Sequence, residues 1–124
     1  MIRILIVDDN AVFRGLMTRL LSRHEDFTVV GEAENGEQAI AQARALDPEV
    51  VLMDFRMPGI DGFTAAVSIK QEFPRMKIFI VTAYAAALDS QTIIKNGLHG
   101  LFLKDRPAEE IIAAIRLELG VGAA

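Results

Sequence analysis

The chain has 124 residues, of which 52% are hydrophobic and 24% charged, with a net charge of −4 and no cysteine. These values predict one globular domain over residues 1–124. The absence of cysteine excludes disulfides and thiolate metal sites. Because the sequence has no basic stripe, we do not expect it to bind nucleic acid through the phosphates. No apolar run approaches the ~20 residues of a membrane span and the N-terminus lacks the apolar region of a signal peptide, so we expect a cytoplasmic protein.

Short apolar runs alternate with segments of helical periodicity from the start of the chain. The first run, Ile4–Val7, is followed by apolar residues that recur on one helical face over residues 12–21. The second run, Thr28–Val30, precedes a second helical pattern over residues 39–46, for which Asn35 is a suitable N-cap. Because the runs lack polar alternation, they are typical of strands buried on both faces.

The middle of the chain repeats the same alternation. The third run, Val50–Met53, is rich in β-branched and apolar residues. A helical pattern over residues 63–73 follows it and is ended by Pro74, which cannot continue a helix. The fourth run is Ile78–Val81. This stretch therefore predicts two further strands with one helix between them.

The last third of the chain predicts two more helices around one more strand. A helix over residues 88–95 is expected, with Asn96-Gly97 as its C-cap. The fifth run is Leu101–Leu103, and Pro107 suits the first position of a fifth helix whose apolar face extends over residues 111–119.

Five strands that alternate with five helices predict a parallel sheet covered by helices on both sides. We expect residues 119–124 to form a frayed tail. In open sheets of this class, ligands bind beyond the carboxyl ends of the strands, so the residues at those ends are the candidates for function.

Polar side chains follow four of the five runs. They are Asp8 and Asp9, Asp54, Thr82 and Lys104. Parallel strands would bring these residues to one edge of the sheet, where three carboxylates repel one another. A hard divalent cation relieves the repulsion, and Mg²⁺ suits such oxygen ligands, with Mn²⁺ as an alternative. The backbone carbonyl of Arg56, in the turn after Asp54, could be a further ligand.

The same set of side chains suits phosphoryl transfer to a carboxylate. A carboxylate can attack phosphorus and form an acyl phosphate. Asp54 is the best nucleophile candidate because it follows a central strand, and Asp8 and Asp9 are better suited to holding the metal. Lys104 and the Thr82 hydroxyl could then contact the phosphoryl oxygens. Taken singly, an acid at a strand end is most often a turn or cap residue, so this hypothesis depends on the convergence of the set.

The motifs "ILIVDDN", "VVLMDFRMPGIDG", "IFIVTAY" and "GLFLKD" resemble a response-regulator receiver domain, the phosphoacceptor module of two-component signalling. The resemblance covers essentially the whole chain and implies a flavodoxin-like fold, a doubly wound five-stranded parallel sheet of order 2-1-3-4-5. It implies a signalling domain rather than an enzyme, phosphorylated on Asp54 by a histidine kinase or a small phosphodonor and able to hasten its own dephosphorylation.

The resemblance also implies a role for each strand-end residue. The metal would be held by Asp54, the Arg56 carbonyl and Asp9, with Asp8 contributing directly or through water. Thr82 and Lys104 would hold the phosphoryl group. Phosphorylation would draw Thr82 inward and change the surface of the fourth helix, fifth strand and fifth helix, through which a homodimer could form.

Finer features resemble the NarL/FixJ group of receivers, namely "FTVVGEAENGEQA" and the pair Lys104-Asp105. Such receivers usually precede a DNA-binding domain, so the chain is either a stand-alone receiver or a piece of a larger regulator. Many receivers carry an aromatic switch residue three positions before the lysine, where this chain has Leu101. Strand alternation predicts that the following Phe102 points to the opposite face of the sheet.

Two other functions remain open from the sequence. One is a receiver-like interaction module that is no longer phosphorylated, against which the full set of acids, threonine and lysine argues. The other is a Mg²⁺-dependent phosphatase with an aspartate nucleophile, as in the haloacid dehalogenases. Those enzymes carry a second acid two residues after the nucleophile, and this chain has Arg56 there.

Overall fold

The structure, a computed structural model, describes residues 1–83 and 89–120. Its elements in chain order are β1 (Ile2–Val7), α1 (Ala11–Ser22), β2 (Phe27–Ala33), α2 (Gly36–Leu46), β3 (Val50–Met53), α3 (Gly62–Glu72), β4 (Lys77–Thr82), α4 (Ser90–Lys95), β5 (Gly100–Leu103) and α5 (Ala108–Leu119). None of the helices in the described ranges is long and apolar enough to cross a membrane.

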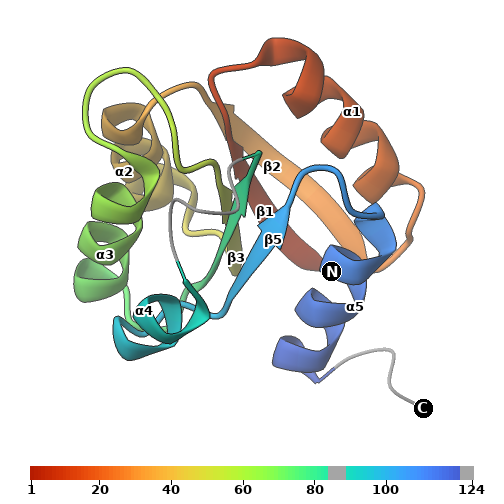
Figure 1. Cartoon of the computed structure of the whole chain (residues 1–124). Helices are drawn as coiled ribbons and strands as arrows, with labels where there is room; N and C mark the ends of the chain where they lie inside the picture. The colour runs from red at the N-terminus through yellow and green to blue at the C-terminus, as the bar shows by residue number, and fades with distance from the viewer. Residues whose placement is uncertain (84–88, 121–124) are drawn as a thin grey trace.

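The strands form one parallel sheet with the order β2-β1-β3-β4-β5, as the family resemblance implied. Figure 1 shows the sheet in the middle of the molecule, with α1 and α5 on one side and α2, α3 and α4 on the other. The order reverses direction between β1 and β3, which places the carboxyl ends of these two strands side by side at the topological switch point.

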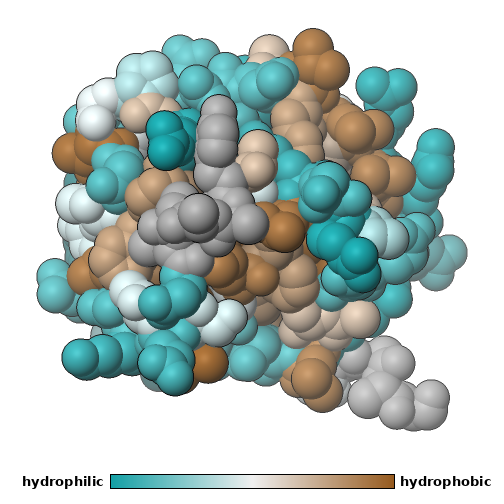
Figure 2. Space-filling model, viewed as in Figure 1, coloured by the Kyte–Doolittle hydropathy of each residue, from teal (hydrophilic) through white to brown (hydrophobic). Residues whose placement is uncertain are grey.

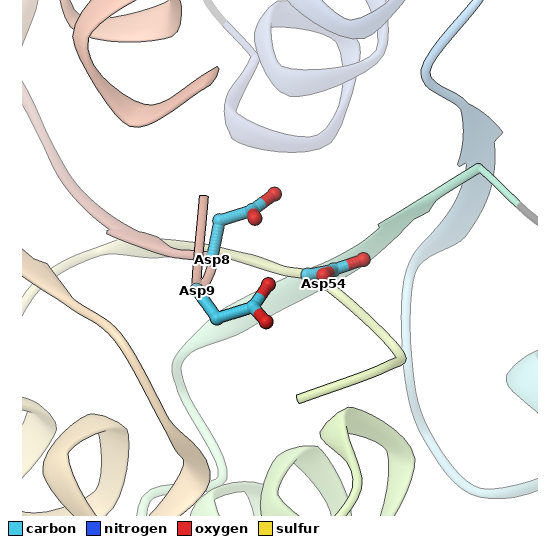
Figure 3. Close-up of side chains that lie close together, drawn as sticks. All are labelled: Asp8, Asp9 and Asp54. Atoms are coloured by element: carbon cyan, nitrogen blue, oxygen red, sulfur yellow. The ribbon is translucent and has the colours of Figure 1, made fainter. Parts of the chain in front are cut away.

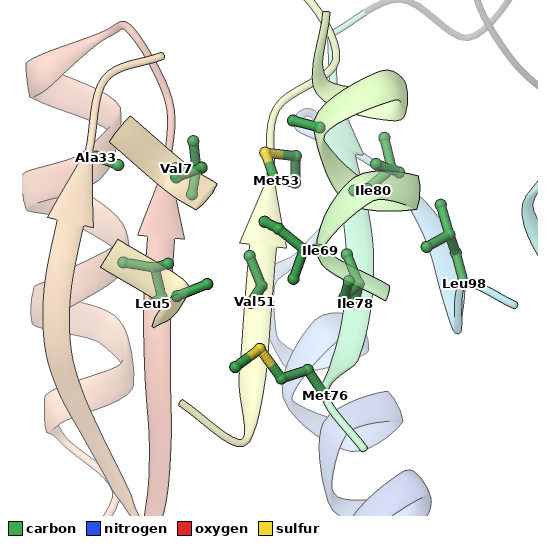
Figure 4. Close-up of a cluster of buried hydrophobic side chains, with 14 of the residues drawn as sticks. Leu5, Val7, Ala33, Val51, Met53, Ile69, Met76, Ile78, Ile80 and Leu98 are labelled. Atoms are coloured by element: carbon green, nitrogen blue, oxygen red, sulfur yellow. The ribbon is translucent and has the colours of Figure 1, made fainter. Parts of the chain in front are cut away.

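Each face of the sheet supports a separate hydrophobic core, because successive strand residues point to opposite faces. Leu5 of β1 and Val51 of β3 lie in the cluster that packs under α2, α3 and α4, part of which is drawn in Figure 4. Their neighbours Ile4 and Leu52 lie in the second cluster, under α1 and α5. The continuous apolar runs of the central strands are thus explained by burial on both sides.

Four helices begin at the carboxyl edge of the sheet with a polar cap. Their capping residues are Asn10, Asn35, Asp61 and Asp89, whose side chains accept hydrogen bonds from backbone N–H groups of the first turn. These caps satisfy N–H donors that a helix start leaves free. Because the helices begin at this edge, their positive ends lie on the same side of the sheet as the acids.

Some predicted boundaries and environments need correction. The edge strands β2 and β5 are only partly buried, not buried on both faces, and β2 extends three residues past Val30. Pro107 is the N-cap of α5 rather than its first residue. Residue 88, the expected start of the fourth helix, and residues 121–124 of the expected tail lie outside the described residues, whereas Leu119 belongs to α5.

Candidate functional site

Three carboxylates meet at the switch point of the sheet. Val7 and Met53 are register partners in β1 and β3, so the acids that follow them, Asp8 and Asp54, lie next to each other. One carboxylate oxygen from each of Asp8, Asp9 and Asp54 can be chosen so that the three atoms lie within 4.8 Å of one another. Figure 3 shows the three side chains directed to the same side of the strand ends. Asp8 and Asp54 are buried and Asp9 is exposed, so the cluster has one open side.

Lys104 brings a positive charge to this cluster from the end of β5. Its Nζ lies 2.6 Å from Oδ2 of Asp8 and 3.6 Å from Oδ1 of Asp54. The backbone N–H of Lys104 donates to the carbonyl of Thr82 at 2.9 Å, which ties the end of β5 to the end of β4. Thr82 itself is fully buried. The predicted convergence of acids, threonine and lysine at one edge is therefore what the fold produces.

The surroundings of Asp54 shift the pKa of its carboxyl group toward neutral pH. The pKa of Asp54 is raised to about 6, chiefly by burial and next by the carboxylate of Asp8, while the ammonium of Lys104 opposes both effects. At neutral pH the carboxylate is still mainly ionised and therefore nucleophilic.

The arrangement fits a divalent cation. Three carboxylates face one ammonium group, so two negative charges are left in excess in a largely buried space. In addition, Oδ2 of Asp8 is buried and accepts no hydrogen bond from the described residues, although it lies in the ion pair with Lys104. Hard oxygen ligands at this spacing suit a hard cation that retains part of its water shell.

Two residues that the sequence did not single out hold the loop that carries Asp8 and Asp9. The side chain of Arg14 donates to the Asp8 carbonyl at 2.6 Å and forms an ion pair with Glu32 of β2 at 3.0 Å. The N–H of Asn10 donates to Oδ1 of Asp8 at 2.9 Å. In the sequence Arg14 reads as the polar face of a helix, and no local signal marks its contact with a loop.

A glycine allows the chain to close tightly behind Asp54. The N–H of Gly62, the first residue of α3, donates to the Phe55 carbonyl at 2.7 Å. A Cβ at position 62 would lie 1.7 Å from the carbonyl oxygen of Asp54, so every other residue type would displace the backbone of the nucleophile candidate. The "MPGIDG" segment therefore serves to seat α3 directly against the strand end.

Leu101, at the position of the usual switch aromatic, and Phe102 lie on opposite faces of the sheet, as strand alternation predicted. Leu101 packs against the cluster under α2, α3 and α4, whereas Phe102 packs on the other face, with its ring centroid 6.0 Å from that of Phe79. Arg56 is exposed in the turn after β3, and its carbonyl as a metal ligand stays a prediction.

Comparison with known proteins gives a consistent result. The family model described as the response regulator receiver domain matches residues 4–116. The response regulator GacA of Pseudomonas protegens is 38% identical over 117 residues, which cover 94% of this chain and 55% of GacA. The nitrate/nitrite response regulator protein NarL of Escherichia coli K12 is 36% identical over 112 residues, covering 90% of this chain and 52% of NarL.

A solved structure agrees over nearly the whole chain. The signal receiver domain of the response regulator NarL from Mycobacterium tuberculosis superimposes with a TM-score of 0.85 at 31% identity, covering 98% of this chain and 97% of that domain. By contrast, the chain spans about half the length of the curated relatives GacA and NarL. The likeness thus concerns only part of those regulators.

Proposed function

The chain belongs to the response-regulator receiver family, and on this premise we propose that it accepts a phosphoryl group on Asp54 from a histidine kinase, in a reaction that depends on Mg²⁺. The observation that carries the proposal is the convergence of Asp8, Asp9 and Asp54 with Lys104 at the switch point of the sheet. The family is a signalling family, and the proposed chemistry is a single transfer to the chain itself.

In the proposed reaction, a carboxylate oxygen of Asp54 attacks the phosphorus of phosphohistidine or of a small donor such as acetyl phosphate. The bond from phosphorus to the donor atom breaks, the donor leaves with the bonding electron pair, and an acyl phosphate remains on Asp54. The ammonium of Lys104, 3.6 Å from Asp54 before the reaction, is near enough to pair with a phosphoryl oxygen, and the Thr82 hydroxyl is the proposed second donor.

Asp9, Asp54 and the Arg56 carbonyl, with Asp8 directly or through water, are the residues that would hold Mg²⁺. When bound, the cation neutralises charge on the carboxylates and on the incoming phosphoryl group, and Mn²⁺ could substitute for it. The carboxylates themselves position the site, because Asp8 and Asp54 are buried and attached to adjacent strands.

Phosphorylation would act as a switch on the surface of α4, β5 and α5. Thr82, at the end of β4, would move toward the phosphoryl group, and Leu101 would respond in place of the usual aromatic residue. Leu101 in β5 is the register partner of Ile80, which lies two residues before Thr82 in β4. A movement of Thr82 would therefore occur close to Leu101 on the neighbouring strand. The expected readout is a partner or a homodimer contact.

Intact-mass spectrometry tests the proposal. With Mg²⁺ and acetyl phosphate, the wild type should gain one phosphoryl group, Asp54→Ala should gain none, and Asp105→Asn, which changes an exposed acid beside Lys104, should behave as the wild type. Uptake by Asp54→Ala equal to that of the wild type would contradict the assignment. No uptake from any donor, including a panel of phosphorylated histidine kinases, would favour the interaction module instead.

A further inference from the structure

One contact of Lys104 has no part in the reaction described above. The ammonium lies over the ring of Phe13, with Nζ 4.4 Å from the ring centroid. Phe13 is in the first turn of α1, which packs on the opposite side of the sheet from α3 and α4. Lys104 is therefore also in contact with a residue from α1, an element that carries no acid of the site.

The ring and a carboxylate together enclose the ammonium. Oδ2 of Asp8 lies 2.6 Å from Nζ, and the Lys104 side chain is only 19% exposed. Phe13 and Lys104 also line a hollow of about 110 Å³ between α1 and α5, whose other walls include Leu16, Ala108 and Ile111. Most residues around this hollow are apolar, with Arg106 as the other charged one, so the Lys104 side chain reaches the acids beside largely apolar surroundings.

We propose that Phe13 is a positioning residue for Lys104, whose ring holds the ammonium at the acidic cluster through a cation–π contact in readiness for the phosphoryl group. The inference rests on the proposed function, because it assigns Lys104 to the phosphoryl oxygens. Phe13 itself touches none of the reacting atoms, so its effect reaches the reaction through Lys104.

An aromatic ring is suited to this task for a specific reason. The ring attracts the cation with its negative face but contains no lone pair that accepts a strong, directed hydrogen bond. The ring therefore does not compete as a strong hydrogen-bond acceptor, and the ammonium keeps N–H donors for Asp8 and for an arriving phosphoryl oxygen. A second carboxylate at the position of Phe13 would compete with the phosphoryl group for Lys104, and an aliphatic side chain would not attract the cation.

The first test observes the contact directly in the unphosphorylated protein. The ammonium groups are labelled with ¹⁵N-lysine, and Lys104→Arg identifies the Lys104 signal among those of the four lysines, Lys70, Lys77, Lys95 and Lys104. Protons above an aromatic ring resonate upfield. We expect an upfield Lys104 signal that moves downfield in Phe13→Leu and stays in place in Phe13→Tyr, without any metal or phosphodonor.

The second test measures the rate of phosphoryl uptake from acetyl phosphate at saturating Mg²⁺ by intact mass. Phe13→Leu should react roughly three- to tenfold more slowly, as expected for loss of a partly desolvated cation–π contact. Phe13→Tyr should react within about twofold of the wild type, because it retains the ring. Phe73→Leu is the matched control, since Phe73 is also half-buried but follows α3 at the opposite edge of the sheet.

A third variant separates positioning from packing. Trifluorophenylalanine introduced at position 13 retains the shape of the ring and weakens its negative face. Reduced uptake and a shifted Lys104 signal in this variant would support the proposal, also if Phe13→Leu failed to fold. Wild-type behaviour in both measurements would overturn it. If the wild type took up no phosphoryl group, the proposed function would fail, while the ammonium signal would still decide the contact between Phe13 and Lys104.

Discussion

Asp54 is mainly ionised at neutral pH, although its surroundings favour the protonated form of its carboxyl group. Its folded-state pKa of about 6 lies above the ordinary value of 3.8, chiefly because of burial and the nearby charge of Asp8. The folded protein therefore binds this proton more tightly than the unfolded chain does. The resulting contribution to stability is complete below the ordinary pKa and is lost as the pH rises through about 6.

Asp54→Asn should consequently stabilise the fold at neutral pH. In the presence of a chelator at about pH 7.5, we expect a gain of about 1 kcal/mol in the free energy of unfolding, less than the whole pKa shift would give because water screens part of the repulsion. Below about pH 4, where the wild-type carboxyl group is protonated as well, the two proteins should unfold alike. Urea denaturation at both pH values measures this, and an equal or lower stability of the variant at the higher pH would contradict the origin assigned to the shift.

A divalent cation should make the wild type more stable than Asp54→Asn, because it relieves the repulsion between the carboxylates. Because the cation would bind the folded acids and not the unfolded chain, Mg²⁺ at about ten times its dissociation constant should stabilise the wild type by about 1.4 kcal/mol. Asp9→Asn, which removes the exposed member of the cluster, should lose most of this gain. Thermal unfolding with and without Mg²⁺ measures the effect. A similar gain for Asp9→Asn and the wild type would show that the acids do not hold the ion.

The elements around the site differ in how far their sequence reveals them. The bounds of β3 were predicted at Val50–Met53 because a fully buried strand is a continuous apolar run between clear breakers. The end of β2 was missed because Gly31 and Glu32 lie in a partly exposed edge strand, where burial imposes no apolar pattern. Pattern therefore locates central strands more accurately than edge strands.

Two helical glycines, Gly62 in α3 and Gly15 in α1, allow a test of how closely α3 packs against the end of β3. Gly62→Ala should destabilise the fold by at least about 2 kcal/mol, since its Cβ would lie 1.7 Å from the Asp54 carbonyl oxygen and α3 would have to move away from β3. Gly15→Ala is the control, because the described residues leave its Cβ position open and α1 would gain helix propensity. That variant should be more stable by about 0.5–1 kcal/mol. Denaturant unfolding of the pair measures the contrast, and equal effects would contradict the close approach.

At the scale of the whole molecule, the acidic cluster could be predicted from the sheet topology, whereas the contacts of Phe13 and Arg14 around it could not, because they depend on tertiary packing. Parallel strands bring Asp8, Asp54 and Lys104 together once the strand ends are known, so residues far apart in sequence could be grouped. Phe13 and Arg14 follow the helical periodicity of α1, and their contacts depend on how α1 docks on the sheet. Periodicity predicts which face of a helix is buried, but it contains no information about which distant side chain that face meets.

The whole molecule should also change its state of association when the site is loaded. The face of α4, β5 and α5 has apolar surface for this: β5 is only partly buried, and Ile94 of α4 is 69% exposed. In Figure 2, hydrophobic residues gather in the middle of the view over β5 and toward α5. We expect the 13.6 kDa chain to be monomeric alone and to form a dimer with beryllofluoride and Mg²⁺, as measured by light scattering.

The position of the interface can be tested with two exposed apolar residues on different helices. Ile94→Lys should prevent the dimer, because the dimer would place like charges from both copies in an apolar contact. Val12→Lys should leave it intact, since Val12, 82% exposed, lies on α1 and outside the proposed face. Both changes are at exposed positions, so unfolding curves should stay close to that of the wild type. If Val12→Lys abolished the dimer and Ile94→Lys did not, the interface would lie on α1, and the switch would reach it by another route than Thr82 and Leu101.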